Sequence, residues 1–153
     1  MAMTMQGEVV LPAERERVWA ALNDPDVLKA CIPGCQELEK VGDTEFRAVV
    51  KAAVGPVKAT FKGAVALSDL DPPNGYTISG EGQGGVAGFA KGGAKVALED
   101  VEAGTKLVYD VSAQVGGKIA QLGGRLINGV AKKYADEFFA NFAKALTPAE
   151  NPA

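Results

Sequence analysis

Few side chains in this sequence could carry acid–base or nucleophilic chemistry. There is no histidine, so Ser–His and Cys–His nucleophile pairs and the usual zinc ligand sets are absent. Cys31 and Cys35 lie four positions apart, and no second pair of ligands accompanies them. A soft metal would require more thiolates or imidazoles, so the spacing favours free structural thiols and no metal site.

The remaining acid–base candidates are the carboxyl groups of Glu45 and Glu81 and the phenols of Tyr76 and Tyr109. Their spacing pairs none of them into a recognisable catalytic set. A glycine-rich run, 80–85, has the composition of a nucleotide loop but lacks both the following helix and a Lys-Ser/Thr pair. We therefore expect a protein that is not an enzyme and has no catalytic residue.

Composition narrows the class of protein further. The 153 residues include 16 Lys and Arg against 19 Asp and Glu, which leaves no basic excess for binding nucleic acid. A hydrophobic content of 47% is enough for one core, so one domain is expected. No apolar run reaches the roughly 18 residues of a membrane span, and the N-terminus has no secretory pattern. These features predict a cytoplasmic protein.

The N-terminal part predicts one strand and two short helices. Residues 6–11 form the strand, which ends at Pro12. The next segment has apolar residues at helical spacing: Val18, Trp19 and Leu22. A second helix is expected over 26–30, between Pro25 and the Pro33-Gly34 turn.

Residues 35–115 alternate between apolar and polar side chains, and turn segments rich in Gly, Pro, Asn and Asp interrupt them. This pattern predicts an antiparallel meander of about six strands with one apolar face and one solvated face. A long helix is expected over 118–146. Its apolar residues recur every four positions and should cover the apolar face: Leu126, Val130, Tyr134, Phe138 and Phe142. The prediction is an α+β domain over 1–147 with a short tail, 148–153.

The apolar face has many small residues and few aromatic ones. If the sheet curves away from the helix, an apolar cavity results; if it is flat, the small residues let the helix pack closely. We expect the cavity, lined by these ligand-binding residues: Phe46, Phe61, Ile78, Phe89, Leu107, Tyr109, Leu126, Val130 and Tyr134. Glycines predict a mobile gate formed by the loop 84–93, with Phe89 at its tip, and by the start of the last helix. Alternatively, these glycines only form tight turns.

Several segments resemble one known family. They are Val18-Trp19 with Leu22-Asn23-Asp24-Pro25, Cys31-Ile32-Pro33-Gly34-Cys35, Gly55-Pro56-Val57 with Phe61-Lys62-Gly63, and Tyr109-Asp110-Val111 with Gly116-Gly117-Lys118-Ile119-Ala120-Gln121-Leu122-Gly123. Together they resemble the CoxG subunit of carbon monoxide dehydrogenase, within the START and Bet v 1-like (SRPBCC) superfamily, from about residue 5 to 146. The resemblance implies a helix-grip fold, in which a curved antiparallel sheet of about seven strands wraps around the C-terminal helix.

The resemblance also implies a function. Family members are accessory proteins of molybdenum-containing carbon monoxide dehydrogenase or a related hydroxylase, recruit that enzyme to the cytoplasmic membrane and bind a quinone or lipid. Longer members continue into an apolar C-terminal segment, whereas this sequence stops at Ala153, which favours transient membrane contact by a protein peripheral to the inner face of the membrane. Two alternatives are a polyketide cyclase-like enzyme that uses the same cavity and a docking protein with a collapsed core. Convergence of two or more of Glu45, Arg47, Glu81 and Tyr109 in the cavity would favour the enzyme, and an all-apolar lining would favour a carrier.

Overall fold

One curved antiparallel sheet and one long helix dominate the computed structural model, which describes residues 1–146. The expected tail, 148–153, lies outside the described residues. The strands are β1 (Ala2–Leu11), β2 (Cys35–Gly42), β3 (Glu45–Val54), β4 (Val57–Asp71), β5 (Gly75–Gln83), β6 (Phe89–Val101) and β7 (Gly104–Gly116). They lie in the order β1-β7-β6-β5-β4-β3-β2, so β1 and β2 form the two edges.

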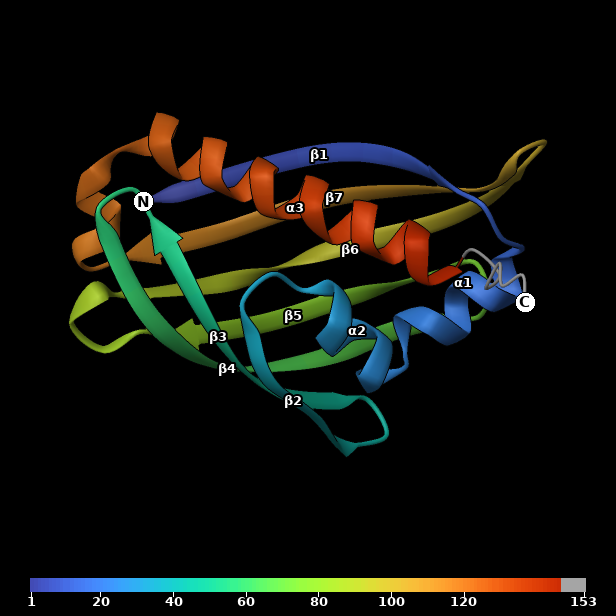
Figure 1. Cartoon of the computed structure of the whole chain (residues 1–153), viewed down its shortest axis with the longest axis horizontal. Helices are drawn as coiled ribbons and strands as arrows, with labels where there is room; N and C mark the ends of the chain where they lie inside the picture. Colours follow the sequence, from blue (N-terminus) through green and yellow to red (C-terminus); the bar gives the residue numbers. More distant parts are fainter. Residues whose placement is uncertain (147–153) are drawn as a thin grey trace, which may run out of the picture.

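The helices lie on the inner face of this sheet. They are α1 (Arg15–Leu22), α2 (Pro25–Cys31) and α3 (Gly124–Leu146), and two 3₁₀ turns, η1 (Gly85–Ala87) and η2 (Lys118–Leu122), occur in the connections. Figure 1 shows α3 running along the inner face of the bent sheet while α1 and α2 close one end. The predicted α+β class and helix-grip arrangement are confirmed.

Two element boundaries differ from those the sequence predicted. The first strand starts at Ala2 instead of Gln6, because β1 pairs with β7 along its whole length, from Ala2 opposite Gln114 to Leu11 opposite Thr105. The long helix starts at Gly124 and not at Lys118. Gly117 and Gly123, at φ 82° and 94°, adopt left-handed backbone conformations on either side of η2, and these interrupt a continuous α-helix.

Apolar residues form two separate cores. The larger core lies where α1, α2 and the C-terminal half of α3 meet the sheet, and Phe142, Leu11 and Val18 are completely buried there. The smaller core lies at the opposite end and contains Ala87, Val115, Ile119 and Ile127. Within residues 1–146 the two cores share no residue, so each end of the molecule is packed independently.

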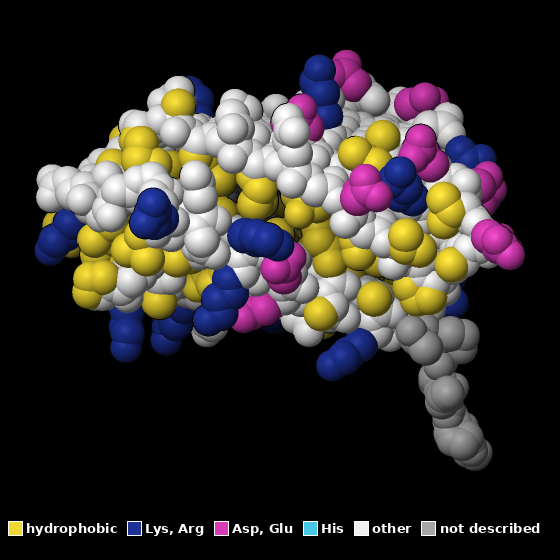
Figure 2. Space-filling model, turned by 90° about the horizontal axis from the view of Figure 1, so that it is seen from above, with side chains coloured by type: hydrophobic (Ala, Val, Ile, Leu, Met, Phe, Trp, Pro, Cys, Tyr) yellow, Lys and Arg dark blue, Asp and Glu magenta, His cyan; other side chains and the backbone are white. Residues whose placement is uncertain are grey.

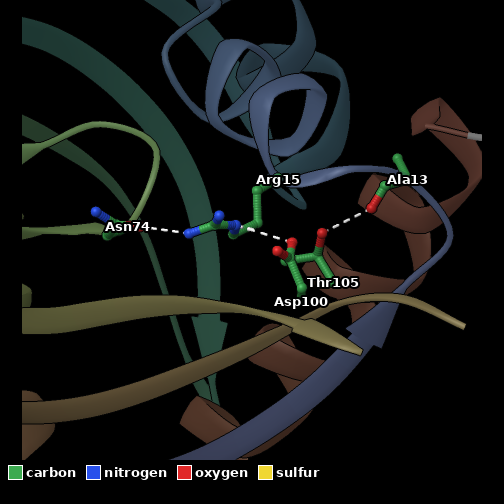
Figure 3. A network of polar contacts seen from close by, with 5 residues as sticks. All are labelled: Ala13, Arg15, Asn74, Asp100 and Thr105. Carbon is green, nitrogen blue, oxygen red and sulfur yellow. Dashed lines mark hydrogen bonds and ion pairs between the residues drawn. The ribbon is translucent and has the colours of Figure 1, made fainter. Parts of the chain in front are cut away.

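Polar contacts fasten α1 to the end of the sheet beside the larger core (Figure 3). The Arg15 guanidinium donates through Nε to Asp100 Oδ1 at 2.8 Å and through Nη1 to Asn74 Oδ1. Close by, the Thr105 hydroxyl donates to the carbonyl oxygen of Ala13 at 2.7 Å, and Thr105 is completely buried. This end of the molecule is therefore fixed by both packing and hydrogen bonds.

Replacing Thr105 with valine should lower the free energy of unfolding by about 1–3 kcal/mol, because the Ala13 carbonyl loses its donor while the volume is unchanged. Thr105→Ser keeps the hydroxyl and should cost about 1 kcal/mol or less. Urea denaturation of both variants measures the difference. Equal losses for the two variants would show that the hydrogen bond contributes little.

Candidate functional site

The inner face of the sheet is hollowed between the two cores. A hollow of about 330 Å³ lies over the central strands β4 to β7. Most of its lining, the floor of the hollow, consists of small and medium apolar residues: Val65, Ile78, Gly80, Gly82, Ala90, Gly92, Ala94, Val111 and Ala113. Glu81, Lys91 and Gly93 complete the lining. Figure 2 shows hydrophobic side chains in a depression on the face seen from above. The cavity that the small residues predicted is therefore present as an open hollow.

Glycine is required in this floor because neighbouring strands approach closely. A Cβ atom on Gly92 would lie 2.2 Å from the carbonyl oxygen of Ser112, and one on Gly80 would lie 2.9 Å from that of Ala64. Both distances are below van der Waals contact, so any other residue would push the strands apart. The glycines permit the local bend of β5 and β6 and leave the floor without side chains.

The helix also turns small residues toward the sheet. A strict four-residue spacing drifts by about 40° per step around an α-helix, so Leu126 and Phe142 lie about 160° apart. Leu126 is indeed 37% exposed, whereas Phe142 is completely buried. The expected stripe therefore does not cover the sheet as one row. The inward face instead follows Ile127, Ala131, Ala135 and Phe142, and the two alanines are half-buried in the middle of α3.

The predicted ligand-binding residues fall into two groups. Ile78 lines the hollow. Phe46, Leu107 and Tyr109 belong to the larger core at one side of it, and Phe46 pairs across the strands with Val65 of the floor. The Tyr109 ring stacks on Phe139 with 5.3 Å between ring centroids. This group surrounds the end of the hollow nearest α1.

The other group lies toward the opposite end and is not brought to the hollow. Phe61 packs against the smaller core, and Phe89 stands on the outer face, 38% exposed. Leu126 and Val130 line a different hollow of about 570 Å³ on α3. The Tyr134 hydroxyl accepts a hydrogen bond from the Ala53 backbone N–H at 3.1 Å.

The expected gate loop is also shorter than predicted. Gln83 pairs with Phe89, so only residues 84–88 connect β5 and β6, and Gly92 and Gly93 are strand residues. The alternation within residues 35–115 puts Val65, Ala94, Val111 and Ala113 on the apolar face, although none of them was predicted as a site residue. The cross-strand register that joins them into adjacent rows was the missing information.

The carboxylates named as candidates do not converge inside. Glu45, Arg47 and Glu81 are exposed and line a separate hollow of about 560 Å³ on the outer face, while Tyr109 faces inward. Burial raises the pKa of the Tyr76 phenol far above its ordinary value, so this group keeps its proton at neutral pH. Of the four groups whose convergence would favour an enzyme, Glu81 also lines the hollow over β4 to β7, whereas Glu45, Arg47 and Tyr109 do not.

The cysteines are both free thiols, with Cys31 buried and Cys35 half-buried. Burial raises the pKa of each thiol, and for Cys35 the nearby Lys29 partly offsets this. Within residues 1–146 no three His, Cys, Asp or Glu side chains gather into a set that could hold a metal ion. None of the described helices combines the length and the apolar character needed to cross a bilayer.

The curved sheet, the long helix along its inner face and the hollow between the two cores define a protein with the helix-grip fold. Within this class, residues 7–147 match the family model that describes CoxG, a subunit of carbon monoxide dehydrogenase, and the chain belongs to that family. No curated protein matches the chain.

Solved structures share this fold. A conserved protein from Geobacillus kaustophilus is 33% identical with a TM-score of 0.88, and the match covers 94% of this chain and 95% of the other. An uncharacterised protein from Rhizobium leguminosarum is 18% identical with a TM-score of 0.70, covering 95% of each chain. Ara h 8.0201, a Bet v 1-like protein, is 16% identical with a TM-score of 0.66, covering 95% and 98%. The last two support the fold alone.

Proposed function

We propose that this protein is a non-catalytic carrier that holds an apolar molecule, a quinone or lipid, in the hollow between the sheet and α3. It serves as an accessory protein of a molybdenum-containing carbon monoxide dehydrogenase or related hydroxylase, which it meets at the cytoplasmic membrane. Membership of the CoxG family supports the link to that enzyme. The apolar hollow supports the carrier role.

The observation that carries the proposal is the lining of the hollow. Its volume of about 330 Å³ is at the lower end of the range for small-molecule sites, roughly 300–1,000 Å³, and fits one ring system or part of an acyl chain. At about 25 cal/mol per Å², burying a few hundred Å² of ligand contributes several kcal/mol. After the cost of association, this suits reversible binding.

Tyr109 is an inward-facing phenol on β7, but its hydroxyl lies over Gly7 of the edge strand β1, on the side of β7 away from β6. Its inward ring lies in the larger core, and Val111, two residues further along the same face of β7, lines the hollow. Because this hydroxyl points toward β1, we expect Tyr109→Phe to change quinone affinity by less than about twofold in a calorimetric titration.

Binding to delipidated protein tests the proposal directly. Calorimetric titration with soluble menaquinone and ubiquinone analogues should give saturable binding, and native mass spectrometry of freshly purified protein should reveal an apolar ligand. Absence of both results would contradict the carrier role. Capture of the hydroxylase by protein that binds no ligand would instead favour the docking alternative.

A further inference from the structure

Charges are unevenly distributed along the molecule. The end opposite α1 is formed by the segments 49–63, 82–93 and 113–133, which we call the basic end. These segments contain eight of the 16 Lys and Arg residues and none of the 19 Asp and Glu residues. The left part of Figure 2 accordingly displays Lys and Arg side chains, while acidic side chains gather toward the right.

The segments of the basic end are neighbours in space. A Cβ atom on Gly88 would lie 2.0 Å from the Gly116 carbonyl oxygen, so the turn after η1 touches the end of β7. A Cβ atom on Gly55 would lie 2.8 Å from Leu126 Cδ2, so the β3–β4 turn touches the start of α3. The three segments of the basic end therefore lie next to one another, and their lysines belong to the same end of the molecule.

Three lysine residues line a hollow on this surface. It has a volume of about 620 Å³, lies between the β3–β4 hairpin, the α2–β2 connection and α3, and is lined by Lys51, Lys58 and Lys133. Glu137 is its one acidic residue, and among residues 1–146 no carboxylate oxygen lies within 4.0 Å of the three ammonium nitrogens. Because the Tyr134 hydroxyl accepts from Ala53 N–H, its own proton is free for donation into this hollow.

Exposed apolar side chains lie at the same end. Val86 in η1 is 90% exposed, and Leu126 at the start of α3 is 37% exposed. The hollow on α3 beside Leu126 shares Lys133 with the lysine hollow, so the two hollows adjoin. Adjacent cationic and apolar surfaces match the headgroup region of a bilayer, where phosphates lie just outside the acyl chains.

We propose that the basic end docks on an anionic lipid bilayer, with lipid phosphates in the hollow between Lys51, Lys58 and Lys133 and with Val86 and Leu126 in the interface. The acid-rich end, which carries α1, faces away from the membrane. This deepens the proposed function, because it orients the carrier at the surface that would supply an apolar ligand. Docking itself is measured without any such ligand.

Vesicle co-sedimentation tests the proposal with the full chain. Binding should be strong to equimolar phosphatidylglycerol and phosphatidylcholine, weak to phosphatidylcholine alone, and reduced by salt, since the Debye length falls from about 10 Å at 0.1 M to about 3 Å at 1 M. The triple variant K51Q/K58Q/K133Q should bind roughly a hundredfold more weakly, at about fivefold per charge.

A matched triple variant supplies the control. R17Q/K40Q/K144Q removes the same charge from exposed residues outside the basic end and should change affinity by less than about threefold. Circular dichroism confirms that both variants fold. Equal losses for the two triples, or equal binding to charged and neutral vesicles, would overturn the docking surface. If inorganic phosphate bound as tightly as charged vesicles, the ligand of the lysine hollow would be a free phosphate and not a lipid headgroup, which would contradict the proposal.

Insertion is tested separately by fluorescence. In Val86→Trp, tryptophan emission should shift to shorter wavelength on adding anionic vesicles, while Leu70→Trp, at an exposed position outside the basic end, should show no shift. An unshifted Val86→Trp emission would overturn the assigned orientation. Quinone binding in solution is unaffected by either outcome, so failure of docking and failure of the carrier role remain distinguishable.

Discussion

Leucine in place of Ala94 should lower the affinity for an apolar ligand by roughly 10- to 100-fold, equivalent to about 1.4–2.7 kcal/mol. Ala94 stands on the floor of the hollow between Ile78 and Val111 on the neighbouring strands. The added side chain occupies space that the ligand would fill. The protein should remain folded because the hollow accepts the extra atoms.

Ala97→Leu is the matched control, since it makes the same change three residues further along β6 on the exposed outer face. It should leave affinity within about twofold of the original. Calorimetric titration with a quinone analogue compares the two variants. Equal affinities would place the ligand somewhere other than the hollow between the sheet and α3.

Phe142→Ala should lower the free energy of unfolding by about 3–5 kcal/mol, the largest loss expected from a single side chain here. Phe142 is completely buried and stacks on Phe138 with 5.5 Å between ring centroids. Its removal leaves a void in the larger core, which holds the C-terminal half of α3 against the sheet. In a domain of this size the loss corresponds to a fall in Tm of roughly 10 °C.

Phe89→Ala compares the same residue type on the outer face, where Phe89 is 38% exposed. It should cost less than about 1.5 kcal/mol. Urea denaturation followed by far-ultraviolet circular dichroism measures both variants. A loss at Phe142 no larger than that at Phe89 would mean that the larger core contributes little to holding α3.

The secondary structure could be predicted from the sequence because it depends on local periodicity. Alternation along 45–54 and 104–116 matches β3 and β7, and the Pro25 and Pro33-Gly34 positions delimit α2. The local pattern predicted the wrong element boundaries where backbone conformation or strand pairing set them. The left-handed Gly117 and Gly123 separate η2 from α3, and pairing with β7 extends β1 to Ala2.

The candidate site depends on contacts between residues far apart in the chain, which the sequence pattern does not specify. Small residues on the apolar face predicted a cavity, yet only the cross-strand register joins Gly80, Gly92 and Ala113 into one floor. Phe89 was expected at the site but lies outside, because its position in β6 puts it on the opposite face from Ala90 and Ala94. Likewise, the rotation of α3 turns Ala131 and Ala135 inward instead of Leu126.

The sequence by itself determined the kinds and order of the elements, the apolar character of one sheet face and, through its lack of histidine, the absence of the commonest acid–base chemistry. Only the tertiary structure decided that two cores leave a hollow between them, that Glu45 and Glu81 face outward, and that lysines of the β3–β4 hairpin and of α3 line one hollow. Periodicity is a property of neighbouring residues, whereas sheet curvature and strand register bring together residues far apart in the chain.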